Sequence, residues 1–128
     1  MHLDVEAVLA IHAEVLAAHG GGAGVRDRAL LESAVAAPRA SFAGEPLLSN
    51  AIEIGAAYLY YLCRNHPFVD GNKRVGAHAC ILFLLSNDVE PIFTPGELVD
   101  VTLAVARGEV SAEALAIWLR QRSRHQER

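Results

Sequence analysis

The chain has 128 residues, of which 52% are hydrophobic and 6% aromatic, and its formal net charge is −4. This length gives one domain with one real core, and an apolar share rich in Ala and Leu favours packed helices over a β-sandwich. The acidic balance excludes a general affinity for nucleic acid, and no apolar run is long enough to cross a bilayer.

The first part of the chain predicts two helices. Apolar side chains recur at helical spacing over residues 4–18, where three glycines follow, and again over residues 27–37, where Pro38 ends the pattern. Residues 38–48 contain Ser, Gly and a second Pro, which predicts a flap-like loop or a short hairpin.

The centre of the chain predicts two further helices. Asn50 and Glu53 form a capping pair at the start of a third helix that runs to Arg64. A fourth helix over residues 72–86 is apolar nearly all round, which is typical of a central helix. Residues 89–93 follow as an extended segment.

Two capping signals begin the last helices. Thr94 and Glu97 form a capping box for a fifth helix that ends near residue 107, and Ser111 caps an amphipathic sixth. The basic residues within 120–128 predict a solvated, fraying helix end. We therefore expect an all-α bundle of about six helices in a single domain over residues 1–128.

The expected compartment is the cytoplasm. The first residues lack the basic and apolar regions of a signal peptide. Cys63 and Cys80 both lie in apolar helical surroundings, which indicates reduced packing residues rather than a disulfide.

The stretch with the most chemistry, residues 66–74, has the sequence His-Pro-Phe-Val-Asp-Gly-Asn-Lys-Arg and links the third and fourth predicted helices. A helix N-terminus offers unpaired N–H groups and partial positive charge to an anion. Lys73 and Arg74 oppose the helix dipole there, so this pair indicates a bound anion such as a phosphate.

His66 and Asp70 carry the titratable groups of this stretch. An imidazole can act as a general base near neutral pH, although a structural His that caps the turn is the alternative. Asp70 could neutralise the cations, cap the fourth helix, or hold Mg²⁺ together with phosphate oxygens.

The other residues of the stretch suit a phosphate-binding turn. Phe68 is expected to plug the space under the turn, and Gly71 to allow a positive φ or a close approach. Lys73 and Arg74 bind phosphate as a point charge and as a planar fork, and Asn72 either binds phosphate or fixes the loop.

This stretch resembles the signature of the Fic/Doc family, His-x-Phe-x-(Asp/Glu)-(Gly/Ala)-Asn-(Gly/Lys)-Arg, at every defined position, and the order of elements is similar from about residue 2 to Leu119. The resemblance implies the Fic/Doc fold, with residues 39–46 as a flap that aligns a target by strand addition. It also implies ATP as substrate, His66 as general base, Mg²⁺ at Asp70, and phosphate binding by the residues Gly71, Asn72, Lys73 and Arg74. Arg64 and His78 are secondary candidates, and core packing is the favoured interpretation of His78.

Two departures indicate the Doc branch of the family. AMP-transferring members have Gly where this chain has Lys73 and a second Arg where it has Ala77. The resemblance then implies an inverted nucleotide, and transfer of the γ-phosphate of ATP to a threonine of elongation factor Tu, which halts translation. Fic-type AMP transfer is the first alternative, and a catalytically silent binding module of the same fold is the second.

The chain also lacks a self-inhibitory sequence of the family form (Ser/Thr)-x-x-x-Glu-(Gly/Asn). The nearest matches, ending at Glu45 and Glu90, fail at the last position because Pro follows each Glu. The resemblance therefore implies a separate Phd-like antitoxin whose C-terminal helix docks over the site, against an apolar groove on the first two helices.

Overall fold

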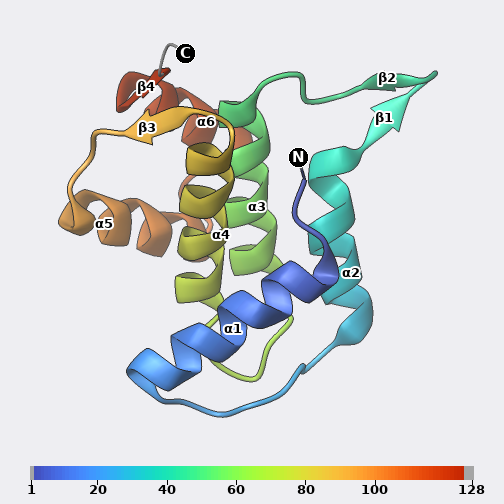
Figure 1. The fold of residues 1–128 in the computed structure, drawn as a ribbon, viewed down its shortest axis with the longest axis vertical. Helices are drawn as coiled ribbons and strands as arrows, with labels where there is room; N and C mark the ends of the chain where they lie inside the picture. The colour runs from blue at the N-terminus through green and yellow to red at the C-terminus, as the bar shows by residue number, and fades with distance from the viewer. Residues whose placement is uncertain (1, 126–128) are drawn as a thin grey trace.

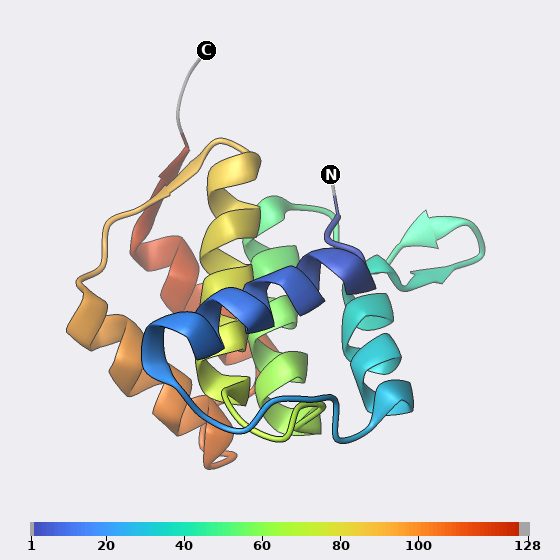
Figure 2. The same cartoon turned by 60° about the horizontal axis from the view of Figure 1, so that its bottom comes forward.

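The computed structural model describes residues 2–125, except for the side chains of Ser41 and Phe42. Six helices build the described part of the chain, which confirms the all-α class (Figure 1). They are α1 (Val5–His19), α2 (Arg28–Ala36), α3 (Ala51–Asn65), α4 (Asn72–Ser86), α5 (Pro95–Ala106) and α6 (Ala112–Gln121). The helices α3 and α4 form a central hairpin that α1 crosses, with α2 along α3, and with α5 and α6 on the remaining sides (Figures 1 and 2).

Local capping explains where the helices begin. Asn50 Oδ1 accepts from the backbone N–H of Glu53 at 2.8 Å, and Asn50 Nδ2 donates to Glu53 Oε1 at 2.7 Å. Thr94 and Glu97 form the complete capping box. Both predicted capping pairs are confirmed, and each satisfies N–H groups that a helix leaves unpaired at its start.

The central hairpin separates two hydrophobic clusters. Tyr58 and Leu62 of α3 face the cluster shared with α1 and α2, whereas Leu59 faces the cluster shared with α5 and α6. Cys63 and Cys80 lie in the second cluster as free thiols, as predicted. Burial raises the pKa of each thiol to about 12.

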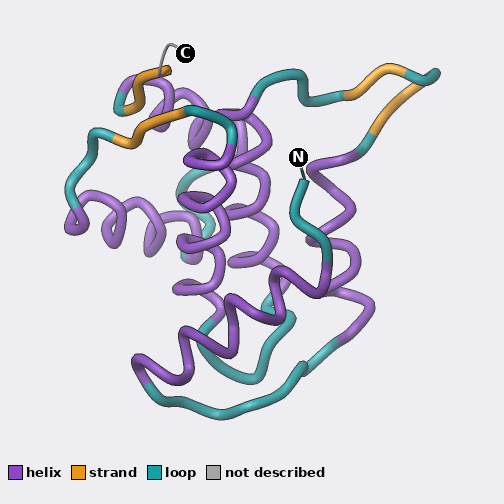
Figure 3. The backbone as a smooth tube through the Cα atoms, viewed as in Figure 1, coloured by secondary structure: helices purple, strands orange, loops and turns teal. Residues whose placement is uncertain are grey.

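The predicted hairpin forms from β1 (Ser41–Phe42) and β2 (Glu45–Pro46), which pair antiparallel after the short 3₁₀ helix η1 (Ala37–Arg39). It projects beside the N-terminal end of α3, and the 66–74 stretch follows the C-terminal end (Figures 1 and 3). Because α3 has 15 residues, these two ends lie about 22 Å apart. The structure therefore does not place the hairpin beside the 66–74 stretch.

Two expectations are corrected by long-range packing. Residues 123–125 do not fray as a helix end but form β4 (Ser123–His125), antiparallel to β3 (Val89–Pro91), and Arg124 binds Glu90 at 2.6 Å; residues 126–128 lie outside the described part. The helix α4 is not buried all round either, because His78, Leu82 and Leu85 form an exposed stripe. None of the described helices has the length and hydropathy needed to cross a membrane.

Candidate functional site

The 66–74 stretch makes a tight connection between two left-handed residues. His66, the C-cap of α3, has φ 50° and ψ 54°, and Gly71, the N-cap of α4, has φ 83°. Gly71 places no side chain over the first turn of α4, and Asp70 does not cap this helix, contrary to one of its three sequence interpretations. The first N–H groups of α4 thus have no side-chain cap, which suits an anion.

Asn72 is the central support of the loop and is only 6% exposed. Its Oδ1 accepts from the backbone N–H of Phe68 at 2.9 Å, and its Nδ2 donates to the Phe68 carbonyl at 3.0 Å. Nδ2 also lies 3.3 Å from Nδ1 of His66. Because the Phe68 N–H can only donate, the amide orientation is fixed. Neutral His66 therefore accepts at Nδ1 and carries its proton on Nε2.

Asp70 is exposed, and each oxygen of its carboxylate has a backbone donor. Oδ1 accepts from the N–H of Gly71 at 2.9 Å, and Oδ2 from the N–H of Gly22 at 3.2 Å. Each carboxylate oxygen keeps further acceptor capacity, so the group remains open to a cation.

His12 of α1 supports the loop from beneath, which the sequence did not indicate. Its ring stacks on Phe68 with centroids 3.9 Å apart and 12° between planes, and Phe68 is 1% exposed. Nε2 of His12 donates to the Asp70 carbonyl at 3.0 Å. The available signal, a His on the apolar face of the first helix, is equally typical of a packing residue.

A pocket of about 550 Å³ opens beside the loop, between the end of α1, the start of α4, and α5. Its volume lies within the usual range for small-molecule sites. Six of the residues proposed from the sequence line it: Asp70, Gly71, Asn72, Lys73, Arg74 and His78. Sequence reasoning missed His19 and the α5 wall formed by Pro95, Leu98, Val99, Thr102 and Leu103.

Arg64 and His66 are not among the residues that line the pocket, and His78 differs from expectation. His78 is exposed and lines the pocket, so the core-packing interpretation is wrong. Arg64 does not line the pocket, and its Nη1 donates to the carbonyl of Ala106 at 3.1 Å, at the end of α5. His66 is exposed on the loop next to the pocket but is not among the residues that line it.

The charges around the pocket suit a polyphosphate that carries a divalent cation. Lys73 and Arg74 are both exposed, and Asp70 is the carboxylate that lines the pocket. Within residues 2–125, no group of three or more His, Cys, Asp or Glu side chains could hold a metal ion. Mg²⁺ commonly binds through one carboxylate plus phosphate oxygens. The residues therefore fit a metal ion that arrives with a polyphosphate.

Comparison with known proteins agrees with the motif. A model of the "Fic/DOC family" matches residues 2–84. The chain is 33% identical to "Protein kinase doc" of Escherichia phage P1 over 120 residues, which cover 94% of each protein. It is 44% identical to "Toxin Doc" of Mycolicibacterium smegmatis (strain ATCC 700084 / mc(2)155) over 73 residues, which cover 57% of this chain and 56% of that toxin.

Proposed function

This chain belongs to the Fic/DOC family, and from that premise we propose that it is a Doc-type toxin with protein kinase activity. It would transfer the γ-phosphate of ATP to a hydroxyl group of a translation factor, with a threonine of elongation factor Tu as the expected target. The phage P1 relative, whose alignment covers 94% of the chain, carries the name of a protein kinase.

The composition of the pocket wall supports this proposal. Lys73 and Arg74 project from the first turn of α4, and Ala77, one turn further, contributes only a methyl group. A second arginine at position 77 would add the fork that binds a further phosphate. Without it, the positive charge lies at one end of the α4 wall, which suits a nucleotide bound by its terminal phosphates.

The reaction needs positioning and charge stabilisation more than covalent catalysis. His66 accepts the proton of the target hydroxyl, whose oxygen forms a bond to the γ-phosphorus, while the bond from that phosphorus to the β–γ bridging oxygen breaks and ADP leaves. Lys73, Arg74 and the uncapped N–H groups of α4 stabilise the negative charge on the phosphates. Asp70 would hold Mg²⁺, which when bound neutralises phosphate charge.

In the tautomer described above, a target hydroxyl would have to reach Nδ1 of His66 to give up its proton. The lone pair of the neutral ring lies on Nδ1, whose contact with Asn72 at 3.3 Å is long for a hydrogen bond. A target hydroxyl that approaches Nδ1 would displace this weak contact.

Transfer from differently labelled ATP tests the reaction. Purified elongation factor Tu is incubated with the protein and with ATP radiolabelled at the γ- or the α-phosphate. Label from γ-labelled ATP alone is the expected result. Label from α-labelled ATP would instead establish AMP transfer, and no label from either, with growth arrest intact, would rule out elongation factor Tu as the target.

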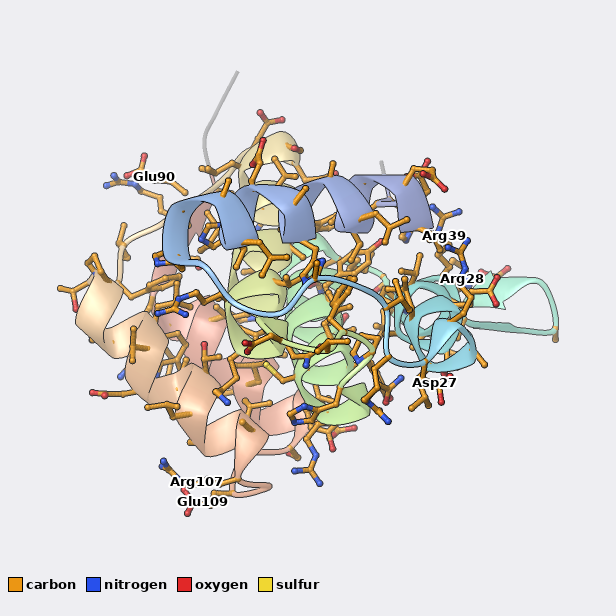
Figure 4. All side chains as sticks on the ribbon, turned by 90° about the horizontal axis from the view of Figure 1, so that it is seen from below. Asp27, Arg28, Arg39, Glu90, Arg107 and Glu109 are labelled. Carbon is orange, nitrogen blue, oxygen red and sulfur yellow. The ribbon has the colours of Figure 1, made fainter. Side chains whose placement is uncertain are left out.

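Two variants test the roles of His66 and Lys73. His66→Ala should abolish both transfer and growth arrest, and persistent arrest would remove His66 as an essential base. Lys73→Gly should reduce γ-phosphate transfer and opens the site to AMP transfer. Arg107→Ala is the control, because Arg107 pairs with Glu109 at 3.0 Å at the end of α5, outside the pocket (Figure 4).

A toxin of this kind requires a separate inhibitor, because neither candidate self-inhibitory glutamate reaches the pocket. Glu45 lies in β2 of the hairpin, and Glu90 pairs with Arg124 at the edge of the molecule in Figure 4. Neither lines the pocket. We propose a Phd-like antitoxin whose C-terminal helix covers the site.

We propose that this helix binds against α4 and α5, rather than against α1 and α2. Leu82 and Leu85 continue the exposed stripe of α4 that begins at His78 in the pocket, and Val99 and Leu103 of α5 are exposed at the pocket wall. Leu82→Glu should weaken binding of the purified antitoxin more than ten-fold relative to Ile117→Glu on α6, which is similarly exposed. Equal losses would refute this placement.

A further inference from the structure

The segment between α1 and α2, residues 20–27, runs across the 66–74 stretch and is called the strap below (Figures 2 and 4). The Val69 N–H donates to the Gly24 carbonyl at 3.1 Å, and the Arg26 N–H donates to the Pro67 carbonyl at 2.7 Å. Arg26 also donates from Nε to the His66 carbonyl at 2.7 Å. The strap and the stretch thus pair as two short antiparallel segments, with an isolated bridge between Val25 and Phe68.

Two glycines of the strap lie against the carboxylate of Asp70. The N–H of Gly22 donates to Oδ2 at 3.2 Å. Gly21 has φ +119°, and a Cβ on it would lie 2.9 Å from Oδ2 and 3.2 Å from Cγ of Asp70. The absence of a side chain at Gly21 is therefore what lets the strap approach and the Gly22 N–H reach the carboxylate.

We propose that Gly21 and Gly22 are positioning residues that fix the orientation of the Asp70 carboxylate. Two hydrogen bonds hold the carboxylate, from the Gly22 N–H to Oδ2 and from the Gly71 N–H to Oδ1, and the His12 ring holds the backbone carbonyl of the same residue. These contacts set the plane of the carboxylate before any ligand arrives. The expected effect on Mg²⁺–ATP binding rests on the proposed function, whereas the orientation of the Asp70 carboxylate by the strap does not.

The clash at Gly21 would disturb the site and leave the fold in place. The nearest atoms to the added Cβ are the end of the Asp70 side chain, followed by Leu16 Cδ2 at 3.3 Å. A side-chain end can rotate away, so the carboxylate would turn and lose its bond to Gly22. Loss of a partner that orients a metal ligand lowers metal affinity by about 10- to 100-fold.

Gly21→Ala and Gly24→Ala form a matched pair. Gly24 has φ +109°, so both variants force alanine into a similarly unfavourable backbone conformation, but a Cβ on Gly24 meets only Val69 Cγ2 at an ordinary 3.8 Å. The Gly24 variant therefore measures the effect of backbone strain alone. Thermal unfolding of both variants shows whether each is folded before any binding is compared.

The first measurement is calorimetric titration of the full chain with ATP, with and without Mg²⁺. Relative to Gly24→Ala, Gly21→Ala should weaken binding about 10- to 100-fold in the presence of Mg²⁺, and leave binding without Mg²⁺ within about two-fold. Equal affinities of the two variants in Mg²⁺ would overturn the positioning role.

The second measurement needs neither nucleotide nor metal. In amide NMR spectra, Asp70→Ala should shift the Gly22 resonance in the wild-type and Gly24→Ala backgrounds, but not in the Gly21→Ala background, where the contact is already lost. The same shift in all three backgrounds would refute the proposal. If the wild-type protein shows no Mg²⁺-dependent ATP binding, the metal role proposed for Asp70 fails, and the Gly22 shifts still decide the role of the strap.

Discussion

Replacement of Asn72 by alanine should destabilise the protein far more than removal of a typical half-buried asparagine. Asn72 Oδ1 and Nδ2 satisfy both the N–H and the carbonyl of Phe68, at 2.9 and 3.0 Å. Phe68 is 1% exposed and Asn72 is 6% exposed, so water cannot easily replace either bond. Alanine leaves two buried backbone groups without a partner.

The expected loss follows from these two groups. An unsatisfied buried donor or acceptor costs about 1–3 kcal/mol, which gives a loss of about 2–6 kcal/mol in the free energy of unfolding. A domain of this size has a total stability of roughly 6–19 kcal/mol. The variant would therefore lose a large share of its stability, although the side chain removed is polar.

Urea unfolding at pH 7 measures the loss, and Asn87→Ala is the control at the other end of α4. Asn87 Nδ2 donates one bond to the Phe83 carbonyl at 2.8 Å, and this half-buried position should lose about 1 kcal/mol. A loss for Asn72→Ala no greater than for Asn87→Ala would refute the reasoning.

Asn72→Asp tests the second part of the argument, the tautomer of His66. The aspartate keeps an acceptor for the Phe68 N–H but places an oxygen where Nδ2 faces Nδ1 of His66. Ring ¹⁵N resonances should show the proton of neutral His66 on Nε2 in the wild type and on Nδ1 in the variant. A wild-type ring protonated on Nδ1 would contradict the assigned geometry.

Two further predictions concern the α3–α4 interface. Gly76→Ala should lower the free energy of unfolding, measured in urea, by about 1–2 kcal/mol. The added Cβ would lie 3.1 Å from the Leu59 backbone carbonyl oxygen, and the overpacking cost of about 1–3 kcal/mol exceeds the gain in helix propensity. An unchanged urea midpoint would show that α3 and α4 can move apart without cost. Cys63 and Cys80 should resist thiol reagents at pH 8 until the protein unfolds. Burial raises the pKa of both thiols from an ordinary value of 9.0 to about 12, so the unfolded state loses these protons at a lower pH than the folded state. The free energy of unfolding should therefore be unchanged below pH 9 and fall as the pH rises towards 12. A urea midpoint that stays constant over this range would show that the thiols are not buried as described.

The helices were predictable because their signals are local. Asn50 with Glu53, and Thr94 with Glu97, lie three residues apart and satisfy each other inside one turn, so a short window of sequence holds all the information that starts the helix. The same holds for the hairpin after Pro38, where Gly44 with φ +84° makes the turn. Such elements do not depend on which distant segment packs against them.

The two wrong predictions, for residues 123–125 and for His78, concern features that depend on distant parts of the chain. β4 exists because residues 123–125 meet β3, 34 residues earlier in the chain at the Arg124–Glu90 pair, and nothing in the basic end of the sequence indicates that partner. His78 appeared to be a core residue because its neighbours in α4 are apolar. It is in fact exposed, together with Leu82 and Leu85 on the same stripe of α4. Both outcomes depend on how much of an element its distant neighbours cover.

The candidate site depends both on local sequence and on distant contacts, so the 66–74 motif alone does not show that the site is intact. Its functional groups are local, since residues 66–74 supply the imidazole, the carboxylate and both cations, but its geometry is held by the first 27 residues. His12 reaches Asp70 across 58 positions, Gly22 across 48, and Arg26 reaches His66 across 40. On the proposal above, a homologue that keeps all nine motif residues but carries a side chain at position 21 would bind Mg²⁺–ATP about 10- to 100-fold more weakly. Retention of the motif is thus incomplete evidence against a silent binding module. The stronger evidence is that His12, Gly21, Gly22 and Arg26 are present with the motif and lie in contact with it.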